Sequence, residues 1–456
     1  MPRNQAISKP GALSQRIGEV IAPALELVPG LVEQAHQGPR QKAQGAQIVI
    51  ALVALTMGLE GGLSQFMMRL FDMSISDAAL SQKGRARMGV ALFEQVVAHV
   101  LRPLADLALH PGCFLHGLRL VGIDGTQYNL SNTPQNNRAV PKAGTRRGKA
   151  AFAKMLLSAL VELGTHAPLA ASLGFAKQGE LGISLPLLER LPERCLLVLD
   201  RLYGNAPMLA ELQRACPQRQ GHFLVRVRDK LAVKTTQRHA DGSAQVEVSL
   251  RDKQRSRKVL ELISTREVRG RVWSRQEKKW AEVRLWTSLS PAQASAEELL
   301  AAYGRRWEQE LCYRELKMDL RGSALLQSHT PVTAAQEVLA MLIGCSILAA
   351  ERLAAAARSE DEEVRRAAAL RISFAKCRVH VIGLWITLEA GAHLLSAQQQ
   401  AGLIEAVYRQ IASEALPKRR PRSCQRKVRQ PVTKWPRMIT PTSLTSPLKS
   451  KVVKIT

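Results

Sequence analysis

The sequence predicts an α/β protein whose core carries a β-strand insertion and lies between helical N-terminal and C-terminal regions. Three patterns support this class. Short apolar runs bounded by Gly, Pro or charge fill residues 117–227, which is typical of buried strands. Alternating apolar and polar residues follow in 228–289, and helical periodicity flanks both regions. At about 150 residues per domain, 456 residues have room for two to four structural units.

The N-terminal region predicts helices. Apolar residues recur at three- and four-residue intervals in 17–31, 48–57 and 90–107. A capping Ser, a short apolar-periodic stretch and a basic end follow one another in 74–89, SISDAALSQKGRARMG. Two interpretations remain open for this segment: part of a helix-turn-helix that contacts nucleic acid, or a surface helix with a solvated basic face.

The central region predicts strands that alternate with helices. Five apolar runs qualify as buried strands: 118–123, 155–163, 168–173, 195–199 and 222–227. Connecting helices are expected at 185–191 and 206–215. Mixed elements in this order indicate an α/β core.

The remaining elements complete the expected organisation. Alternation in 245–250, 258–263 and 283–287 predicts a small antiparallel β unit, and 295–356 and 361–414 are expected to be helical. The expected domains are a helical N-terminal domain, an α/β core, a helical region and a tail: 1–115, 116–360 interrupted by 228–289, 361–415 and 416–456.

Charge is the most unusual property of the composition. The chain has 65 Lys and Arg against 38 Asp and Glu, a formal net charge of +27. Such an excess indicates a polyanionic partner, with nucleic acid favoured. Residues 416–456 hold twelve of the cations, no acid and several prolines, so this tail is expected to be disordered when free.

Other classes of protein are disfavoured. The N-terminus lacks an apolar signal core, and the apolar stretches 48–59 and 338–350 look too short to span a bilayer. Seven scattered cysteines without a CxxC pair indicate reduced thiols in the cytoplasm. The histidines show no spacing typical of a zinc site.

Two acids stand where apolar runs end. Asp124 follows LRLVGI and Asp200 follows CLLVL. Ligands of open α/β sheets gather beyond the carboxyl ends of strands, so both acids are candidate site residues. Each has a simpler alternative, because Asp124-Gly125 can form a turn and Asp200 can cap the next helix.

A third candidate acid lies in AAYGRRWEQELCYRELKMDL, which is expected to be one helix. At about 100° per residue, one face gathers a phenol, cations and a single acid. These residues are Tyr303, Arg306, Glu310, Arg314 and Lys317. A lone carboxylate among cations suits a face that binds phosphate and metal, and an ion pair of Glu310 with Arg306 or Arg314 is the alternative. Glu308 and Glu315 point away from this face, so alanine at either is expected to keep activity.

Together these segments resemble a known family. Tyr303, Arg306, Glu310 and Lys317 fit the Tyr-x2-Arg-x3-Glu-x6-Lys signature of DDE transposases of bacterial insertion sequences, in the insertion-element-four group. DGTQYNLSNTPQNN from Asp124 resembles the first-Asp motif of that group. LVLDRLYGN resembles its second-Asp motif, with Leu202 in place of the usual Gly. The segment 75–89 and the basic tail resemble further parts of the family, so the resemblance covers nearly the whole chain.

The resemblance implies a ribonuclease-H-like core with two Mg²⁺ ions, for which Mn²⁺ can substitute. Asp124, Asp200 and Glu310 are then the catalytic and metal-binding acids, with Asp124 shared. Residues expected to hold DNA phosphates are Tyr303, Arg306, Lys317, Arg314 and Arg201. Trp280, or Trp286 as the second choice, could stack on a base turned out of the duplex, although a core position is the simpler interpretation.

The implied partners are the terminal inverted repeats and target DNA, bound by a homodimer on paired ends. Cut-and-paste transposition is the implied activity, and relatives cut the second strand through a hairpin. Two alternatives remain: a DNA-binding protein descended from a transposase, and a nuclease on the same fold that cleaves without joining.

Overall fold

The computed structural model describes residues 12–416 apart from 28, 31–42, 59–60, 146–147, 176–177, 229–230, 253–257, 275–278 and 368–369. The side chains of 12–14, 145, 272–274 and 279–281 are also outside the description. Residues 1–270 and 282–419 belong to one compact unit. The second unit, Arg271–Ala281 with Arg420–Thr456, falls mostly outside the described residues, as does the expected disordered tail.

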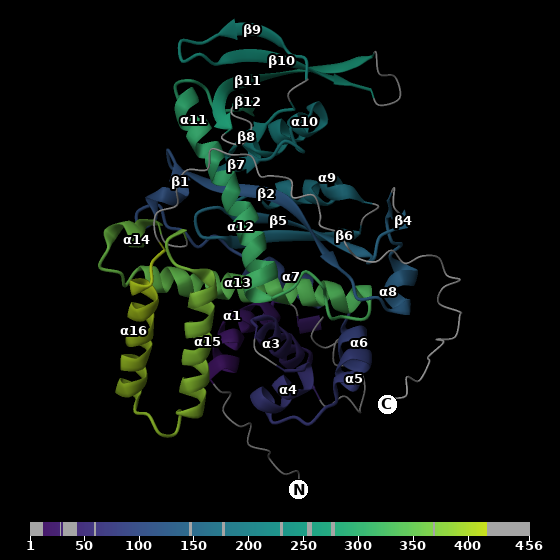
Figure 1. Ribbon diagram of the computed structural model, residues 1–456, viewed down its shortest axis with the longest axis vertical. Helices are drawn as coiled ribbons and strands as arrows, with labels where there is room; N and C mark the ends of the chain where they lie inside the picture. Colours follow the sequence, from purple (N-terminus) through teal and green to yellow (C-terminus); the bar gives the residue numbers. More distant parts are fainter. Residues whose placement is uncertain are drawn as a thin grey trace, which may run out of the picture. The chain divides into compact units, whose positions relative to one another are not determined.

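One mixed sheet dominates the described part of the chain (Figure 1). Its strands follow the order β6-β5-β2-β7-β8-β12-β11-β10-β9, with the short β1 paired to β2. The strands are β1 Phe114–Leu115, β2 Leu118–Asn129, β5 Lys154–Glu162, β6 Ala167–Phe175, β7 Cys195–Leu199, β8 His222–Arg226, β9 Lys234–Arg238, β10 Ala244–Arg251, β11 Val259–Ser274 and β12 Lys279–Thr287. A separate pair, β3 Gly144–Thr145 and β4 Gly148–Lys149, forms a two-stranded hairpin.

The centre of the sheet is parallel and its flanks are antiparallel. β2, β7 and β8 run parallel, with Ile123 opposite Leu199 at the end of the first pair. β5 and β6 continue antiparallel on one side, and β12 joins β8 antiparallel on the other. The insertion is antiparallel as predicted, and it extends the core sheet because β12 pairs directly with β8.

Helices lie before, between and after the strands. The N-terminal ones are α1 Ala12–Glu26, α3 Gly45–Thr56, α4 Leu63–Phe71, α5 Asp77–Ala79, α6 Ala86–Met88 and α7 Ala91–Val100, with a π-helical segment Leu80–Arg85 between α5 and α6. The others are α8 Pro134–Ala139, α9 Gly179–Ser184, α10 Ala206–Ala215, α11 Ala296–Tyr303, α12 Trp307–Arg314, α13 Pro331–Ala356, α14 Glu362–Ala367, α15 Phe374–Ala390 and α16 Ala397–Ser413. Short 3₁₀ segments occupy Pro111–Cys113, Leu185–Arg190, Pro217–Arg219 and Gly304–Arg306.

Several predicted boundaries were wrong. The helix expected over 90–107 ends at Val100, because Pro103 has no N–H to donate and restricts the residue before it. The strand expected to stop at Ile123 continues to Asn129, so Asp124 lies inside β2 and pairs with Ala159 of β5.

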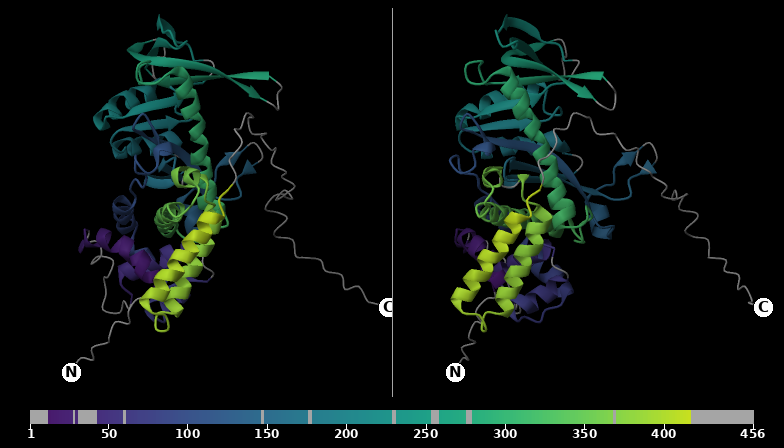
Figure 2. Two further views of the ribbon diagram at one scale, coloured as in Figure 1. Left: turned by 90° about the vertical axis from the view of Figure 1, so that its left-hand side faces the viewer. Right: turned by 60° about the vertical axis from the view of Figure 1, so that its left-hand side comes forward.

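Apolar packing joins the terminal regions to the core. One buried cluster combines residues of α1, α3, α4 and α7 with α13, α15, α16 and the side of β5. Figure 2 shows α15 and α16 side by side as an antiparallel pair. Two further clusters cover the opposite faces of the parallel strands, one with α10 and one with α11.

The long helix α13 is part of this core. The helix has 26 residues and is long and apolar enough to cross a membrane, but 83% of its most apolar window is buried inside the protein. The apolar stretch 338–350 was expected to be too short to span a bilayer, but it belongs to a helix that is long enough to do so. Burial against neighbouring helices explains its composition without a bilayer.

The basic segment 74–89 is also partly internal. Arg85 is buried and donates to Gln336 Oε1 (3.1 Å) and Ser328 Oγ (3.1 Å). Lys83 and Arg87 are exposed. A contact of this segment with nucleic acid would therefore rest on those two cations and not on Arg85.

Candidate functional site

The site begins where the parallel pairing of β2 and β7 stops. The last pair is Ile123 with Leu199, so the next residue of each strand is an aspartate. Asp124 Oδ1 accepts a hydrogen bond from Gly125 N (2.8 Å), and Asp200 Oδ1 accepts one from Leu202 N (2.6 Å). The helix-capping alternative for Asp200 was wrong, because Asn205 is the N-cap of α10. The hydrogen bond from Leu202 N instead fixes the Asp200 carboxylate at the edge of the sheet.

The charge of Asp200 acts on Asp124. Burial and, next, the charge of nearby Asp200 raise the pKa of Asp124 to about 7, against the Gly125 hydrogen bond and Arg306 that lower it. A buried carboxylate next to a like charge ionises poorly unless a cation is present. A cation bound near Asp124 would therefore favour its ionised form.

Glu310 lies on the helical run that crosses the sheet, where it pairs with Arg306, whose charge also acts on Asp124. The run is not one regular helix: α11 leads through a 3₁₀ turn, Gly304–Arg306, into α12, and a π-helical segment, Glu315–Leu320, follows. Glu310 Oε1 accepts from Arg306 Nη2 at 2.8 Å. The ion-pair alternative for this face is thus realised with Arg306.

Tyr303 and Arg306 lie beside the acids. Burial raises the pKa of Tyr303, although the charges of Arg306 and Arg226 act in the opposite direction. The Arg306 guanidinium also lies 5.3 Å from the ring centroid of Trp307. Its charge acts on Asp124 as well as on Glu310, so Arg306 supplies positive charge to two of the three predicted acids.

Lys317 lies on the same side of the sheet, farther along β2. Its ammonium group donates to the hydroxyl of Thr126 and lies 5.2 Å from the ring centroid of Tyr128. Burial lowers the pKa of Lys317, and the positive charge of Lys154 lowers it further. The π-helical segment changes the phase of this part of the helix, so contact with Thr126, and not helical periodicity alone, fixes the side chain.

The other predicted DNA-binding residues lie at the surface, in the core or outside the described residues. Arg314 and Arg201 are exposed, the first at the end of α12 and the second in the turn after β7. The Trp280 side chain lies outside the described residues. Trp286 is fully buried and donates from its indole nitrogen to Glu267 Oε2 (3.1 Å), so the core interpretation is confirmed for Trp286.

The predicted acids do not form a ready-made metal cage. Within the described residues, no group of three or more His, Cys, Asp and Glu side chains is placed to hold a metal ion. Glu310 is instead paired with Arg306 at 2.8 Å.

Sequence reasoning missed a fourth acid. Glu180 of α9 accepts hydrogen bonds from Gly125 N (3.0 Å) and from the hydroxyl of Tyr203 (3.1 Å). A cavity of about 290 Å³ opens next to it, lined by Gly125, Thr126, Gln127, Leu156, Leu157, Glu180 and Ile183. The residues around Glu180 in the sequence form no motif, so its position near the aspartates follows only from the fold.

Glu308 and Glu315 lie away from the site face, as predicted, but they are not in solvent. His166, which is fully buried, contacts Glu308 Oε2 through Nε2 (3.0 Å) and Glu315 Oε2 through Nδ1 (2.9 Å). Burial opposes the imidazolium, yet the two carboxylates raise the pKa of His166. Arg352 of α13 donates to Glu315 Oε1 (2.9 Å), and with His166 it brings the pKa of Glu315 down to about 2 against the effect of burial. This network fixes the side of the helical run that faces away from the site.

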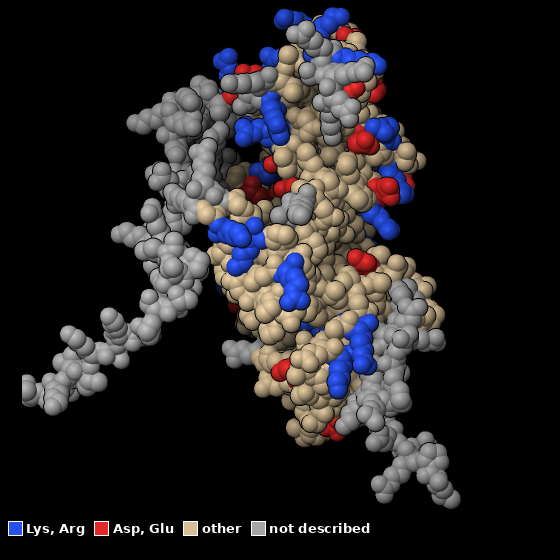
Figure 3. Space-filling view, turned by 90° about the vertical axis from the view of Figure 1, so that its right-hand side faces the viewer, with Lys and Arg blue, Asp and Glu red and all other residues tan. Residues whose placement is uncertain are grey.

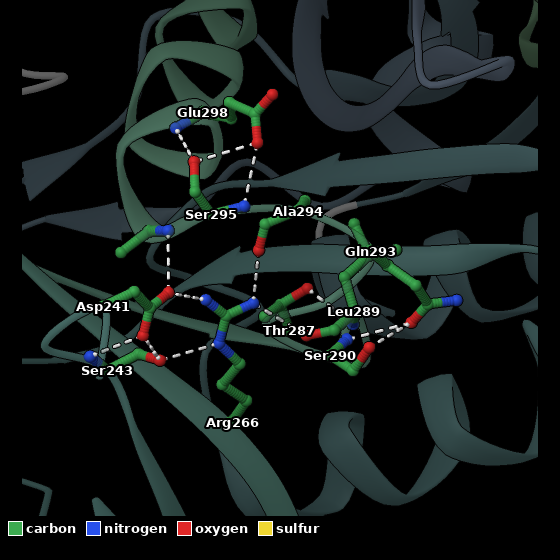
Figure 4. A network of polar contacts seen from close by, with 11 residues as sticks. Asp241, Ser243, Arg266, Thr287, Leu289, Ser290, Gln293, Ala294, Ser295 and Glu298 are labelled. Carbon is green, nitrogen blue, oxygen red and sulfur yellow. Dashed lines mark hydrogen bonds and ion pairs between the residues drawn. The ribbon is translucent and has the colours of Figure 1, made fainter. Parts of the chain in front are cut away.

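A second network fixes the start of the helical run (Figure 4). Arg266 of β11 is buried and donates to Ser243 Oγ (2.8 Å), Leu289 O (3.0 Å) and Ala294 O (2.7 Å). Asp241 pairs with Arg266 and accepts from Ala296 N (3.0 Å), the first residue of α11. The insertion is thereby tied to the helix that leads to Glu310.

Surface charge agrees with an acidic centre inside a basic protein. On the face drawn in Figure 3, red carboxylate side chains lie in a hollow, and blue Lys and Arg side chains lie above and below it.

Comparison with known proteins gives three findings. The family described as "Transposase DDE domain" matches residues 116–346. The transposase InsG for insertion sequence element IS4 of Escherichia coli K12 is 25% identical over 377 residues, which cover 81% of this chain and 79% of InsG. The putative transposase InsZ of the same organism is 30% identical over 103 residues, 22% of this chain and 34% of InsZ.

A solved structure, the piggyBac transposase synaptic complex with hairpin DNA, aligns with 97% of this chain and 93% of its own at 10% identity, with a TM-score of 0.42. The family match covers just over half of the chain and includes β2, β7 and α12 with their acids. The chain belongs to the DDE transposase family, in the IS4 group, whose members are enzymes with a ribonuclease-H-like core that cleave DNA and transfer its strands.

Proposed function

We propose that this transposase cuts DNA at the ends of an insertion sequence and joins the freed ends to target DNA, with Asp124, Asp200 and Glu310 as its catalytic acids. The observation that supports this most is the end of the parallel β2–β7 pairing, which is followed by an aspartate on each strand. The pKa of Asp124, raised by burial and by Asp200, agrees with a site that receives cations.

The donor set fits Mg²⁺, with Mn²⁺ as a substitute. All three candidate ligands are carboxylates, and hard divalent cations prefer oxygen. Asp124, Asp200 and Glu310 would hold two ions, with Asp124 shared between them. When bound, the ions would activate the attacking oxygen and stabilise the leaving oxygen of a phosphodiester.

Arg306 controls whether Glu310 is free to join the aspartates. A guanidinium pairs with phosphate as readily as with carboxylate. A phosphate near the scissile bond would attract Arg306 away from its 2.8 Å contact with Glu310. The carboxylate would then be released toward Asp124 and Asp200, so Glu310 would complete the site only on DNA, whereas the two aspartates could hold an ion without it.

Tyr303 and Lys317 would hold neighbouring phosphates. Both lie on the site side of the helical run, Tyr303 beside Arg306 and Lys317 on Thr126 of β2. Fixing the phosphodiester in line with the nucleophile is a large part of such catalysis. Arg314 and Arg201 are exposed and would contact backbone farther from the cut.

The reaction consists of two similar displacements. Water attacks first and frees a 3′ hydroxyl at the element end, and that hydroxyl then attacks target DNA. Because only the nucleophile differs, one set of side chains serves both steps. We propose that a homodimer holds paired ends in the bacterial cytoplasm, at the nucleoid.

A strand-transfer assay with pre-cut ends tests this function. Wild-type protein in Mg²⁺ is expected to join a 3′-hydroxyl end to a target plasmid, and Glu297→Gln, an exposed acid of α11, serves as the matched control. Cleavage of uncut ends without joining would favour the nuclease alternative. Binding of ends with neither reaction would favour the DNA-binding protein. A denaturing gel would also show whether the second strand is cut through a hairpin.

A further inference from the structure

We infer that Glu180 is a positioning residue that fixes the Asp124 segment against the turn after Asp200, and that it acts through two hydrogen bonds. No motif assigns this residue a role. The inference rests on the proposed function, because it explains how two of the proposed catalytic acids are held at a fixed separation.

The first contact is to the residue after Asp124. Gly125 N donates to Glu180 Oε1 at 3.0 Å, and it also donates to Asp124 Oδ1 at 2.8 Å. A Cβ atom at position 125 would lie 2.3 Å from Glu180 Cδ. Glycine is therefore required at this position for Glu180 to lie over the β2 backbone.

The second contact is to the turn that follows Asp200. The Tyr203 hydroxyl donates to the same atom, Glu180 Oε1, at 3.1 Å. Tyr203 is only 1% exposed, and its backbone N–H donates to Asp200 O at 3.2 Å. A single oxygen of Glu180 thus joins the strand that carries Asp124 to the turn that carries Asp200.

Buried hydroxyl groups extend this connection to the third acid. Ser184 Oγ lies 3.0 Å from the Tyr203 hydroxyl and 2.7 Å from Ser158 Oγ, which donates to Asp124 O at 3.3 Å. Asp124 O also accepts from the hydroxyl of Tyr313, three residues after Glu310 on α12. All three acid-bearing segments are therefore linked through polar groups around Asp124.

The geometry separates a positioning role from a charge role. Both hydrogen bonds end on Oε1, so Glu180→Gln can keep both acceptor contacts while it removes the negative charge. Glu180→Ala removes both contacts. A residue that holds geometry should tolerate Gln and not Ala, whereas a carboxylate that binds an ion directly should tolerate neither.

The test compares Glu180→Ala, Glu180→Gln and Tyr203→Phe with wild type in a cleavage assay on end DNA. Glu189→Ala, an exposed carboxylate in the segment after α9, is the control. Mn²⁺ binding by calorimetry is a readout besides activity, and thermal unfolding in EDTA reports folding. A misplacement of about 1 Å can slow a reaction about 100-fold, so Glu180→Ala is expected to lose 10-fold to 100-fold in rate and to bind Mn²⁺ more weakly.

Glu180→Gln is expected to stay within about threefold of wild type, a small loss next to that of Glu180→Ala. Tyr203→Phe should be slower than wild type, and combining it with Glu180→Ala should add little further loss, because both changes break the same connection.

Several results would overturn the inference. These are wild-type cleavage and Mn²⁺ binding by Glu180→Ala, or a loss in Glu180→Gln as large as in Glu180→Ala. If Glu180→Ala proves too unstable to fold in EDTA, the other two variants decide. Cleavage and Mn²⁺ binding that are strongly reduced in Glu180→Gln, or unchanged in Tyr203→Phe, would then overturn the inference. If wild type fails to cleave, or Asp124→Ala cleaves normally, the proposed function fails. If wild type cleaves, Asp124→Ala does not and Glu180→Ala does, only the role of Glu180 fails.

Discussion

Replacing Asp124 with asparagine should stabilise the metal-free protein above pH 7. The change removes a carboxylate that burial and the Asp200 charge keep from ionising easily. Asparagine keeps an oxygen that can accept the hydrogen bond from Gly125 N, so the local backbone contact should persist. The stability gain thus isolates the electrostatic cost of placing Asp124 at the end of the β2–β7 pairing.

The pH dependence follows from the direction of the pKa change. In the unfolded chain Asp124 has its ordinary pKa of 3.8, and in the folded protein its pKa is about 7. The folded state therefore holds the proton more tightly, and stability from this group is complete below about pH 4 and is lost as pH rises through 7. Asparagine does not titrate, so the two proteins should diverge over this window.

The structure also sets the size of the effect. At about 1.4 kcal/mol for each pKa unit, the increase from 3.8 to about 7 corresponds to at most about 4 kcal/mol of unfolding free energy. The difference between Asp124→Asn and wild type should therefore be near zero at pH 4 and reach a few kcal/mol at pH 8.

Urea unfolding in EDTA at several pH values measures this difference. Adding Mg²⁺ at pH 8 should stabilise wild type more than Asp124→Asn, since a ligand that binds only the folded state raises stability. Parallel pH profiles for the two proteins in EDTA would refute the electrostatic reasoning. A larger Mg²⁺ effect on the variant would refute the assignment of Asp124 as a ligand.

Three further predictions concern other parts of the chain. Lys317→Ala should slow cleavage about 10-fold to 100-fold with little change in overall DNA affinity, because Lys317 is proposed to set phosphate geometry; an unchanged rate in single-turnover assays would contradict this. Glu315→Ala should lower the unfolding free energy by about 3–5 kcal/mol, because it leaves Arg352 buried without its carboxylate; a melting temperature equal to wild type would count against it. Deleting 416–456, with its twelve cations and no acid, should flatten the slope of log K against log salt by roughly three to four for end and random DNA alike, and a loss confined to end DNA would indicate sequence recognition instead.

The Glu315 prediction revises an expectation from the sequence. Helical periodicity predicts that Glu308 and Glu315 point away from the site face, so alanine at either is expected to keep activity. Both carboxylates instead contact His166, which lies about 150 residues earlier in the chain. An exposed acid such as Glu297 is therefore the better control for Glu310.

Local patterns predicted the elements whose ends are marked by a capping residue, a proline or a change from apolar to polar residues. α10 begins and ends where predicted, at Ala206 and Ala215, because Asn205 accepts from Met208 N at its start and Pro217 follows its end. β7 also matched at both ends, since its five residues are all buried. Both Asp motifs and the four-residue signature could be found because they lie in short, continuous segments.

Contacts between distant segments could not be predicted in this way. Arg85 belongs to a basic stretch in sequence, yet it is buried against residues about 250 positions away. Glu180 is 55 residues from Gly125 and has no distinctive neighbours. The 3₁₀ turn and π-helical segment around α12 also leave no periodic signal, because they alter a helical pattern by only one residue.

Cleavage of labelled end DNA in Mg²⁺ by wild type, Asp124→Asn, Asp200→Asn, Glu310→Gln and the control Glu297→Gln tests the central claim most directly. Three acids on β2, after β7 and on α12 are claimed to form one catalytic centre. We predict that each of the three variants binds the end with affinity close to wild type, since basic surface supplies affinity, but gives no detectable cleavage. Glu297→Gln should cleave at the wild-type rate. Cleavage near the wild-type rate by any one of the three variants would contradict the claim.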